Sequence, residues 1–302
     1  MKKHSSMALV VFAVCMVSYS GPMVKGALNE GASPISVALL RMLAAALLML
    51  PYEARQCVRR RIPMKLTPAQ WGLTALAAAF LAAHYITWIT SLTGTSTFAS
   101  VALVCTQPLF VAFFSYVLFH ERTPRRALPG ALLALLGAVT IALSGLSGQE
   151  AQATGQEALR SNLLALAGAV LMAAHWLAGR QIRQTLAAEV YTPVLYLITA
   201  LLLALCLPLS GGFRMPLSAL PYMAGLVIGS TLLGHAVFAY ALSGVSANVI
   251  SFALLGEPVG AMIFSMIFFG EVPTWPVALG GLLTLMGLAL YLAFAGGEKQ
   301  PA

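Results

Sequence analysis

Long apolar runs alternate with short polar loops over the whole chain. A helix needs about 20 apolar residues to cross a hydrocarbon core of ~30 Å, and the chain offers such a run again and again. The runs are continuous and show no ten-residue alternation, so they predict helices and not a barrel. We expect ten spans, of which the second is the shortest. They cover residues 7–24, 35–50, 68–91, 96–119, 127–146, 161–179, 190–209, 219–242, 246–269 and 275–295.

Composition excludes a soluble enzyme. The chain has 302 residues, of which 60% are hydrophobic and 9% charged, and a mean hydropathy of +0.88. Its net charge of +8 does not indicate nucleic-acid binding, because the charges lie in short loops between apolar spans. With the N-terminus inside, 13 Lys and Arg residues lie in inner segments and three in outer segments. This bias predicts a multi-pass protein of the cytoplasmic (inner) membrane with both termini cytoplasmic.

The N-terminal segment resembles a signal peptide in its Lys2-Lys3 start. It lacks an A-x-A cleavage site and runs directly into the polar stretch 18–22, so we expect a retained first helix. The four cysteines and five histidines show no metal-ligand spacing. We therefore predict no disulfide, no metal site and no cofactor.

A shift of 150 residues superposes the two halves of the chain. Without a gap, Pro108 meets Pro258 and Glu121 meets Glu271. Five spans in each half make the second half enter the membrane from the opposite side. Such an inverted repeat is typical of secondary transporters, whose substrate site lies at the repeat interface. The predicted parts are a first repeat (1–146), an extracytoplasmic linker (147–160), a second repeat (161–295) and a cytoplasmic tail (296–302).

Several stretches together resemble the ten-span drug/metabolite transporter superfamily with paired EamA-type domains. They are ISVALLRMLAAALLML, TSTFASVALVCTQPLFVAFFSYVLFHE and ANVISFALLGEPVGAMIFSMIFFGE. The resemblance implies an all-α polytopic membrane protein whose helices surround a central cavity that opens alternately to either side. Characterised relatives mostly export metabolites. The chain departs from many relatives at Ser18-Tyr19, where they have Trp-Gly facing the cavity, so their substrates do not transfer to it.

Glu257 is the first candidate for the substrate cavity. It lies about ten residues, or ~15 Å, into its span, where an isolated charge is costly. Two interpretations stay open: it faces the cavity and takes a proton or a cationic group, or it braces a kink at Pro258. Gln107-Pro108 is its uncharged repeat counterpart. We expect Pro108, Pro258 and Pro22 to act as hinge or gating positions.

Histidines and aromatic residues supply the other cavity candidates. His84, His175 and His235 lie within spans, where each either responds to protons or only packs. Trp88 shares a helix face with His84, and Tyr240 lies in the polar-aromatic run after His235. Ser18, Tyr19 and Trp176 lie in the first helices of the two halves, as cavity walls or as interfacial anchors.

Other charged and small residues favour structural roles. Arg41, in the second span, either reaches the outer surface or pairs with a carboxylate. Glu121 and Glu271 end their spans as salt-bridge or gate partners. The run 59–61 fits lipid headgroups. Small residues in the fifth and tenth spans favour packing within the chain over a dimer contact.

These features together predict a secondary transporter of small organic metabolites (amino acids, amines or drug-like compounds). We expect alternating access and export, with uptake as the alternative and protons as a candidate coupling ion. A membrane enzyme is disfavoured because the loops contain no HxxxH, GxSxG or acidic pair. A non-transporting receptor would lack a substrate cavity. The expected partners are the substrate and membrane lipid, in a monomer or weak homodimer.

Overall fold

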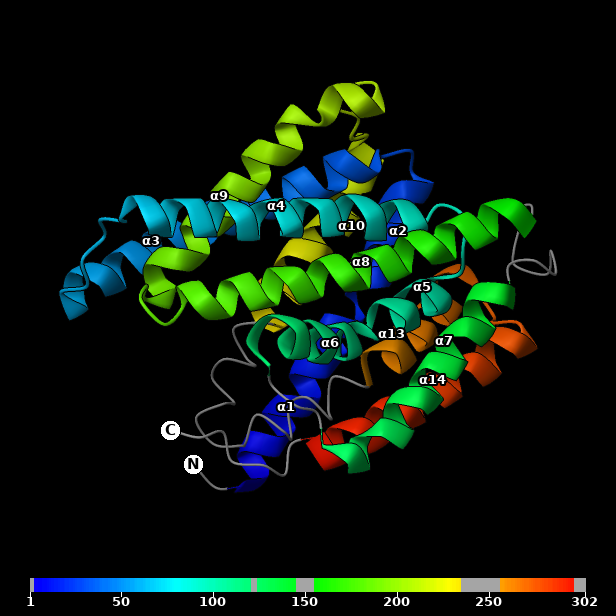
Figure 1. Cartoon of the computed structure of the whole chain (residues 1–302). Helices are drawn as coiled ribbons and strands as arrows, with labels where there is room; N and C mark the ends of the chain where they lie inside the picture. The colour runs from blue at the N-terminus through cyan, green and yellow to red at the C-terminus, as the bar shows by residue number, and fades with distance from the viewer. Residues whose placement is uncertain (1–2, 121–123, 145–154, 235–255, 296–302) are drawn as a thin grey trace.

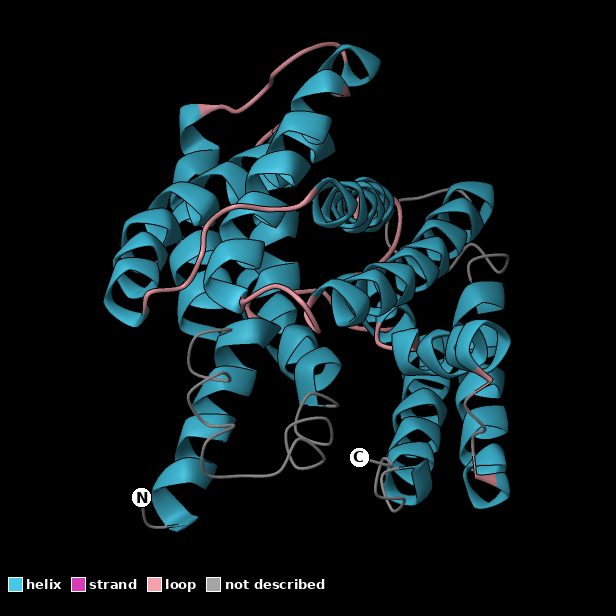
Figure 2. Ribbon diagram, turned by 60° about the vertical axis from the view of Figure 1, so that its left-hand side comes forward, coloured by secondary structure: helices cyan, strands magenta, loops and turns pink. Residues whose placement is uncertain are grey.

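The computed structural model describes residues 3–120, 124–144, 155–234 and 256–295. Within these ranges the chain forms helices joined by loops, and no strand (Figures 1 and 2). The first half contains α1 (Lys3–Ser18), α2 (Ser20–Asn29), α3 (Pro34–Arg60), α4 (Pro68–Ser91), α5 (Thr97–Val104), α6 (Gln107–Phe119), the short turn η1 (Arg125–Ala127) and α7 (Leu128–Ser144). The second half contains α8 (Gly155–Ile182), α9 (Ala188–Leu205), the short turns η3 (Leu207–Ser210) and η4 (Leu217–Ala219), α10 (Leu220–Ala224), the π-helix η5 (Gly225–Gly234), α13 (Gly256–Phe269) and α14 (Trp275–Ala295).

Within the described residues, nine helical stretches are long and apolar enough to cross a membrane, and α13 is a shorter apolar helix. The expected third span, 68–91, coincides with α4. The first part of the expected ninth span, 246–255, lies outside the described residues. An all-helical polytopic architecture is therefore confirmed.

The expectation that the second span is the shortest is wrong. α3 has 27 residues and continues through Pro51 to Arg60, where Arg61 closes it in a left-handed conformation (φ 53°). A proline inside a helix removes one hydrogen bond but need not end the helix. The continuation carries Tyr52 and Val58, which are both exposed, and ends in basic residues. After Pro51 the helix therefore continues, but most of its side chains become exposed or polar.

The helices of the two halves interdigitate. α1 packs on η5 and α13, and α2 packs on α10, so the first span of one half contacts the third and fourth spans of the other. α8 packs in the same way on α4, α5 and α6, and in Figure 1 it lies beside α4 along most of its length. We call α1, α2, α10, η5 and α13 the first bundle, and α4, α5, α6 and α8 the second bundle. The contacts of α3 with α9 and of α7 with α14 form two further seams between the halves.

The α7–α14 seam shows the relation between the halves at residue level. A Cβ atom at Gly137 would collide with the backbone of Thr284, and one at Gly287 would collide with the backbone of Ala134. The 150-residue shift turns the first pair into the second. The two helices therefore run antiparallel about a local two-fold axis, and the small residues pack within the chain, as expected.

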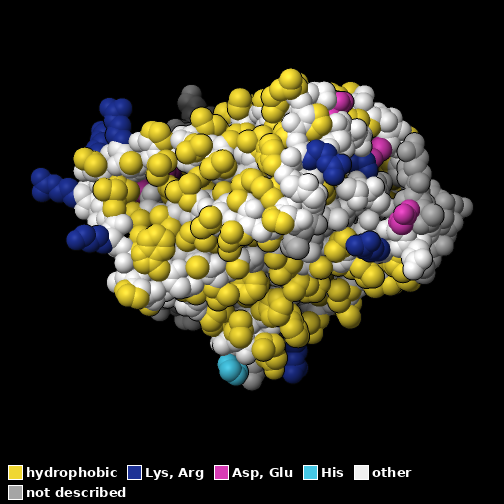
Figure 3. All heavy atoms as spheres, turned by 90° about the horizontal axis from the view of Figure 1, so that it is seen from above, with side chains coloured by type: hydrophobic (Ala, Val, Ile, Leu, Met, Phe, Trp, Pro, Cys, Tyr) yellow, Lys and Arg dark blue, Asp and Glu magenta, His cyan; other side chains and the backbone are white. Residues whose placement is uncertain are grey.

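Charge and apolar surface are separated along the molecule. Hydrophobic side chains cover the middle of the face in Figure 3; Lys and Arg side chains lie toward its left end, and both basic and acidic side chains lie in its right half. We call the end where α3 stops and α4 begins the Arg60 end, and the opposite end, where α2 and α4 stop, the Lys25 end. The largest buried core lies between the two ends, where α2, α3, α4, α9 and η5 meet.

Candidate functional site

Arg41 lies in the interior of α3, and its side chain is only 4% exposed. Its Nε donates a hydrogen bond to Thr231 Oγ1 of η5 at 3.1 Å, and its Nη1 donates one to Ser20 Oγ of α2 at 3.2 Å. Both partners are neutral hydroxyl groups. Arg41 does not reach the surface, and among the described residues no carboxylate forms an ion pair with it. It is a buried cation held by helices of both halves.

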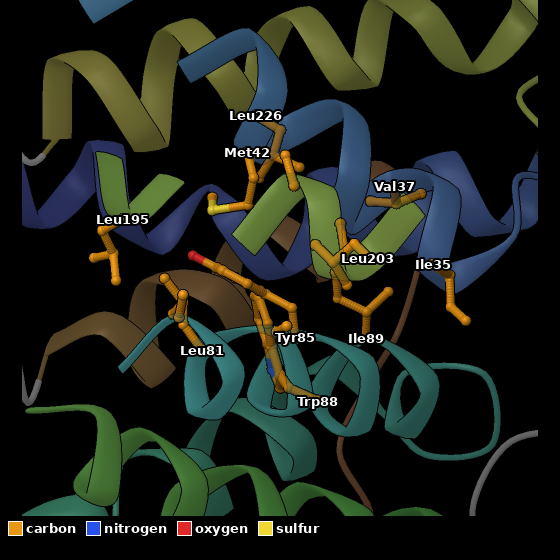
Figure 4. Packing of buried hydrophobic residues seen from close by; sticks show 14 of the residues in the cluster. Ile35, Val37, Met42, Leu81, Tyr85, Trp88, Ile89, Leu195, Leu203 and Leu226 are labelled. Atoms are coloured by element: carbon orange, nitrogen blue, oxygen red, sulfur yellow. The ribbon is translucent and has the colours of Figure 1, made fainter. Parts of the chain in front are cut away.

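Aromatic rings of α4 cover the guanidinium of Arg41. Its Cζ lies 5.1 Å from the ring centre of Tyr85 and 6.0 Å from that of Trp88, distances at which a cation is attracted to a ring face. Figure 4 shows Tyr85 and Trp88 projecting from α4 into the core, with Met42 near Tyr85. The ring of His84 stacks on Trp88 with centres 5.8 Å apart and planes 14° apart. The three rings form a continuous wall beside Arg41.

Glu257 is the second residue of α13 and is partly buried. It lies close enough to Arg41 and to Cys105, at the end of α5, for electrostatic interaction with both. Of the nine acidic residues in the sequence, it is the one placed centrally in an apolar span. One turn further along α13, Ser18 occupies the space that a Cβ atom at Gly260 would need. Glu257 therefore lies where the two bundles and α3 converge.

His84 and His175 form a reciprocal pair of hydrogen bonds between α4 and α8. His84 Nδ1 lies 2.9 Å from Gly168 O, and His175 Nδ1 lies 2.9 Å from Ala77 O. A carbonyl oxygen only accepts, so each Nδ1 atom carries the proton. On both helices the histidine and the carbonyl are two turns apart, which suits antiparallel packing. This geometry supports the packing interpretation of these two histidines.

Two of the three hinge candidates lie just after a helix interruption. α5 ends before Pro108 and α6 begins at Gln107; α1 ends and α2 begins around Tyr19, before Pro22. A proline has no N–H, so the carbonyl four residues earlier loses its usual partner. Pro258 is buried near the start of α13, but the residues before Gly256 lie outside the described part.

Several buried polar side-chain atoms have no hydrogen-bond partner among the described residues. They include Trp88 Nε1, Gln107 Oε1 and Ser18 Oγ, all from the predicted site. A buried polar group without a partner costs about 1–3 kcal/mol. Such groups are rare in folded proteins and often belong to functional sites.

The remaining candidates are less central. Tyr19 packs edge-on against Phe264 and Phe268 of α13, with ring centres 4.9 and 5.7 Å away. Trp176 is 45% exposed. His235 and Tyr240 lie outside the described residues.

The sequence analysis did not place Arg41 in the substrate site, although a basic residue within an apolar span often indicates a functional site. It also did not identify Tyr85 and Thr231. Thr231 is 190 positions from Arg41, and no pattern in the sequence relates them.

Comparisons with known proteins agree with this architecture. A model of the EamA-like transporter family matches residues 4–143 and 159–293, once in each half. A solved crystal structure resembles the chain with a TM-score of 0.63 at 18% identity, over 98% of this chain and 100% of the other. That similarity concerns the fold. No curated protein matches the sequence.

Proposed function

Because the chain belongs to the EamA-like transporter family, we propose that it exports small organic metabolites across the cytoplasmic membrane by alternating access. The substrate binds between the two bundles, beside Arg41 and Glu257. The observation that carries this proposal is that one buried cation and one central carboxylate from the other half lie within electrostatic reach of each other without forming an ion pair. Buried charges inside a membrane are costly and are retained for function.

The chemistry of this centre favours a substrate with both an acidic and a basic group. In the described part of the chain the hydrogen-bond partners of Arg41 are neutral hydroxyl groups, so its guanidinium is suited to receive a carboxylate. Glu257 is suited to an ammonium group or a proton. The rings of Tyr85 and Trp88 provide an apolar wall. Amino acids fit this description best among the candidate substrates.

The arrangement of the helices supports alternating access. The first helix of each half belongs to the bundle of the other half, so a rocking motion changes the space between the bundles at both ends. The interruptions before Pro108 and Pro22 provide places where the helices bend. Export is the preferred direction, with uptake as the alternative.

A ligand screen on purified protein tests the proposal. Thermal unfolding is followed with amino acids, amines and drug-like cations at two pH values, for wild type and for Glu257→Gln. We expect a ligand that raises the unfolding temperature in a pH-dependent way, and loss of that shift in the variant. Glu30→Gln is the matched control, because Glu30 is exposed at the end of α2. An unchanged shift in Glu257→Gln would show that Glu257 only braces the helix.

Transport itself is measured in liposomes. We expect radiolabelled ligands from the screen to exchange across the membrane, and opposite orientations of the protein to distinguish export from uptake. Absence of exchange for every stabilising ligand would refute the proposal.

A further inference from the structure

At the Lys25 end, one lysine and one glutamate of the first bundle hold a turn of the second bundle. Lys25 lies in α2, and its Nζ donates to Leu92 O at 2.6 Å and to Thr95 O at 3.2 Å. The same Nζ lies 3.7 Å from Glu271 Oε1, just after α13. Glu271 Oε2 accepts the backbone N–H of Thr97 at 3.0 Å. The sequence-based expectation that Glu271 is a salt-bridge partner agrees with this contact; Glu121 lies outside the described residues.

Each charge lies at the helix end that it stabilises. Leu92 is the C-cap of α4, where free carbonyl groups create a negative partial charge, and Thr97 is the first residue of α5, where free N–H groups create a positive one. The ammonium group is at the first end and the carboxylate at the second. The α4–α5 turn is thus held by electrostatic attraction as well as by hydrogen bonds.

The turn is fastened to the rest of the second bundle. Thr95 Oγ1 donates to Asn162 Oδ1 of α8 at 2.7 Å. A force on the turn therefore acts on α8 as well as on α4 and α5. Through the turn, Lys25 and Glu271 connect the two bundles as whole bodies.

Lys25 and Glu271 form hydrogen bonds with backbone carbonyl and N–H groups of the turn, and water can form hydrogen bonds with the same groups. The two side chains are each 16% exposed, so solvent already reaches them. Separation of the bundles would exchange these hydrogen bonds for hydrogen bonds to water, at modest cost. The backbone packing of the α7–α14 seam is different, because water cannot replace the close contacts between the two helices.

We propose that Lys25 and Glu271 form a latch that closes the Lys25 end and must release for that end to open. The inference rests on the proposed transport function, and the predicted topology places the latch on the outer side. Removal of either charged side chain shifts the protein toward the state that is open at this end.

Spin-label distances test the latch without a transport assay. Labels replace Thr93, exposed on the turn, and Val272, exposed after α13, in a protein whose four cysteines are substituted. We expect Lys25→Met and Glu271→Gln each to raise the population with the longer separation about fivefold or more, since about 1 kcal/mol corresponds to that factor. Glu189→Gln, which breaks the exposed ion pair at the Arg60 end, is the matched control and should leave the distances unchanged.

Two variants in different segments, one in α2 and one just after α13, keep the test decisive if one of them fails to fold. Unchanged distances in a folded latch variant would overturn the proposal and make the pair a static brace. A second measurement cross-links cysteines at Thr93 and Val272: transport should stop and return on release. Transport that continues under the cross-link would also overturn it. If wild type moves no substrate, the distance measurement still judges the latch, whereas the proposed function fails.

Discussion

The α7–α14 seam and the junction at the Lys25 end both join the two halves, but through different kinds of contact. At the seam, glycines bring two backbones together with no space for a side chain. At the junction, two charged side chains reach the ends of two helices. The first contact loses its packing outright when the helices separate, and the second exchanges one set of hydrogen bonds for another. The fold therefore distinguishes contacts that keep the halves together from contacts that can open.

The largest effect is expected at the seam. Gly287→Leu places a side chain against the backbone of α7, and we expect the free energy of unfolding to fall by about 3 kcal/mol. Thermal unfolding in detergent and the yield of monodisperse protein measure the loss. Gly72→Leu is the control, because a Cβ atom at this helical glycine meets nothing within 4 Å. Equal stability of the two variants would mean that the seam is not a fixed contact.

A smaller effect is expected at the buried cation. Arg41→Leu leaves the hydroxyl groups of Ser20 and Thr231 without their donor, at a cost of about 2 kcal/mol, and removes the site for a substrate carboxylate. We expect transport to fall by more than about tenfold. Thr231→Val, which removes one hydroxyl partner, should cost about 1 kcal/mol and keep most of the transport. Full activity of Arg41→Leu would place the substrate elsewhere.

The histidine pair should contribute stability but no pH response. His84→Gln and His175→Gln retain a side-chain donor that does not titrate, so we expect a loss of about 1 kcal/mol or less for each. The pH dependence of transport should match that of wild type. A changed pH profile in either variant would make that histidine a proton-binding group, against the packing interpretation.

The smallest effect is expected at the Arg60 end. Arg60 Nη1 lies 2.7 Å from Glu189 Oε1, but the arginine side chain is 62% exposed. Exposed ion pairs contribute little because water and salt screen them. Glu189→Gln should change the free energy of unfolding by less than about 0.5 kcal/mol, as measured by thermal unfolding at low and high salt. A clear, salt-dependent loss would make the ion pairs at the two ends equivalent.

Much of the fold follows from local pattern. The run 68–91 forms α4 because its hydropathy is continuous and Thr67 and Gln70 form a capping box at its start. The 150-residue repeat predicted that the small residues of α7 and α14 pack within the chain, and they do.

The site depends on contacts between residues far apart in the sequence, and the pattern of hydrophobic and polar residues could not predict these contacts. Charge and depth made Glu257 a candidate, and spacing on one face related His84 to Trp88. The hydroxyl partners of Arg41 come from two other helices, and only the interdigitation of the halves brings them together. The predicted second span ended at residue 50, just before Pro51, whereas α3 continues through this proline to Arg60.

The exchange of first helices between the halves has a consequence for biosynthesis. Gly256, where α13 begins, follows Asn29, where α2 ends, by 227 residues. At about 5–20 residues per second, the ribosome needs roughly 10–45 s to complete that distance. Throughout this interval α1 lacks its neighbour α13 and Lys25 lacks Glu271, although Arg41 and the α4–α5 turn are made early in it. The face of α1 that packs on α13 is therefore covered by lipid or by another partner until the last part of the chain is made.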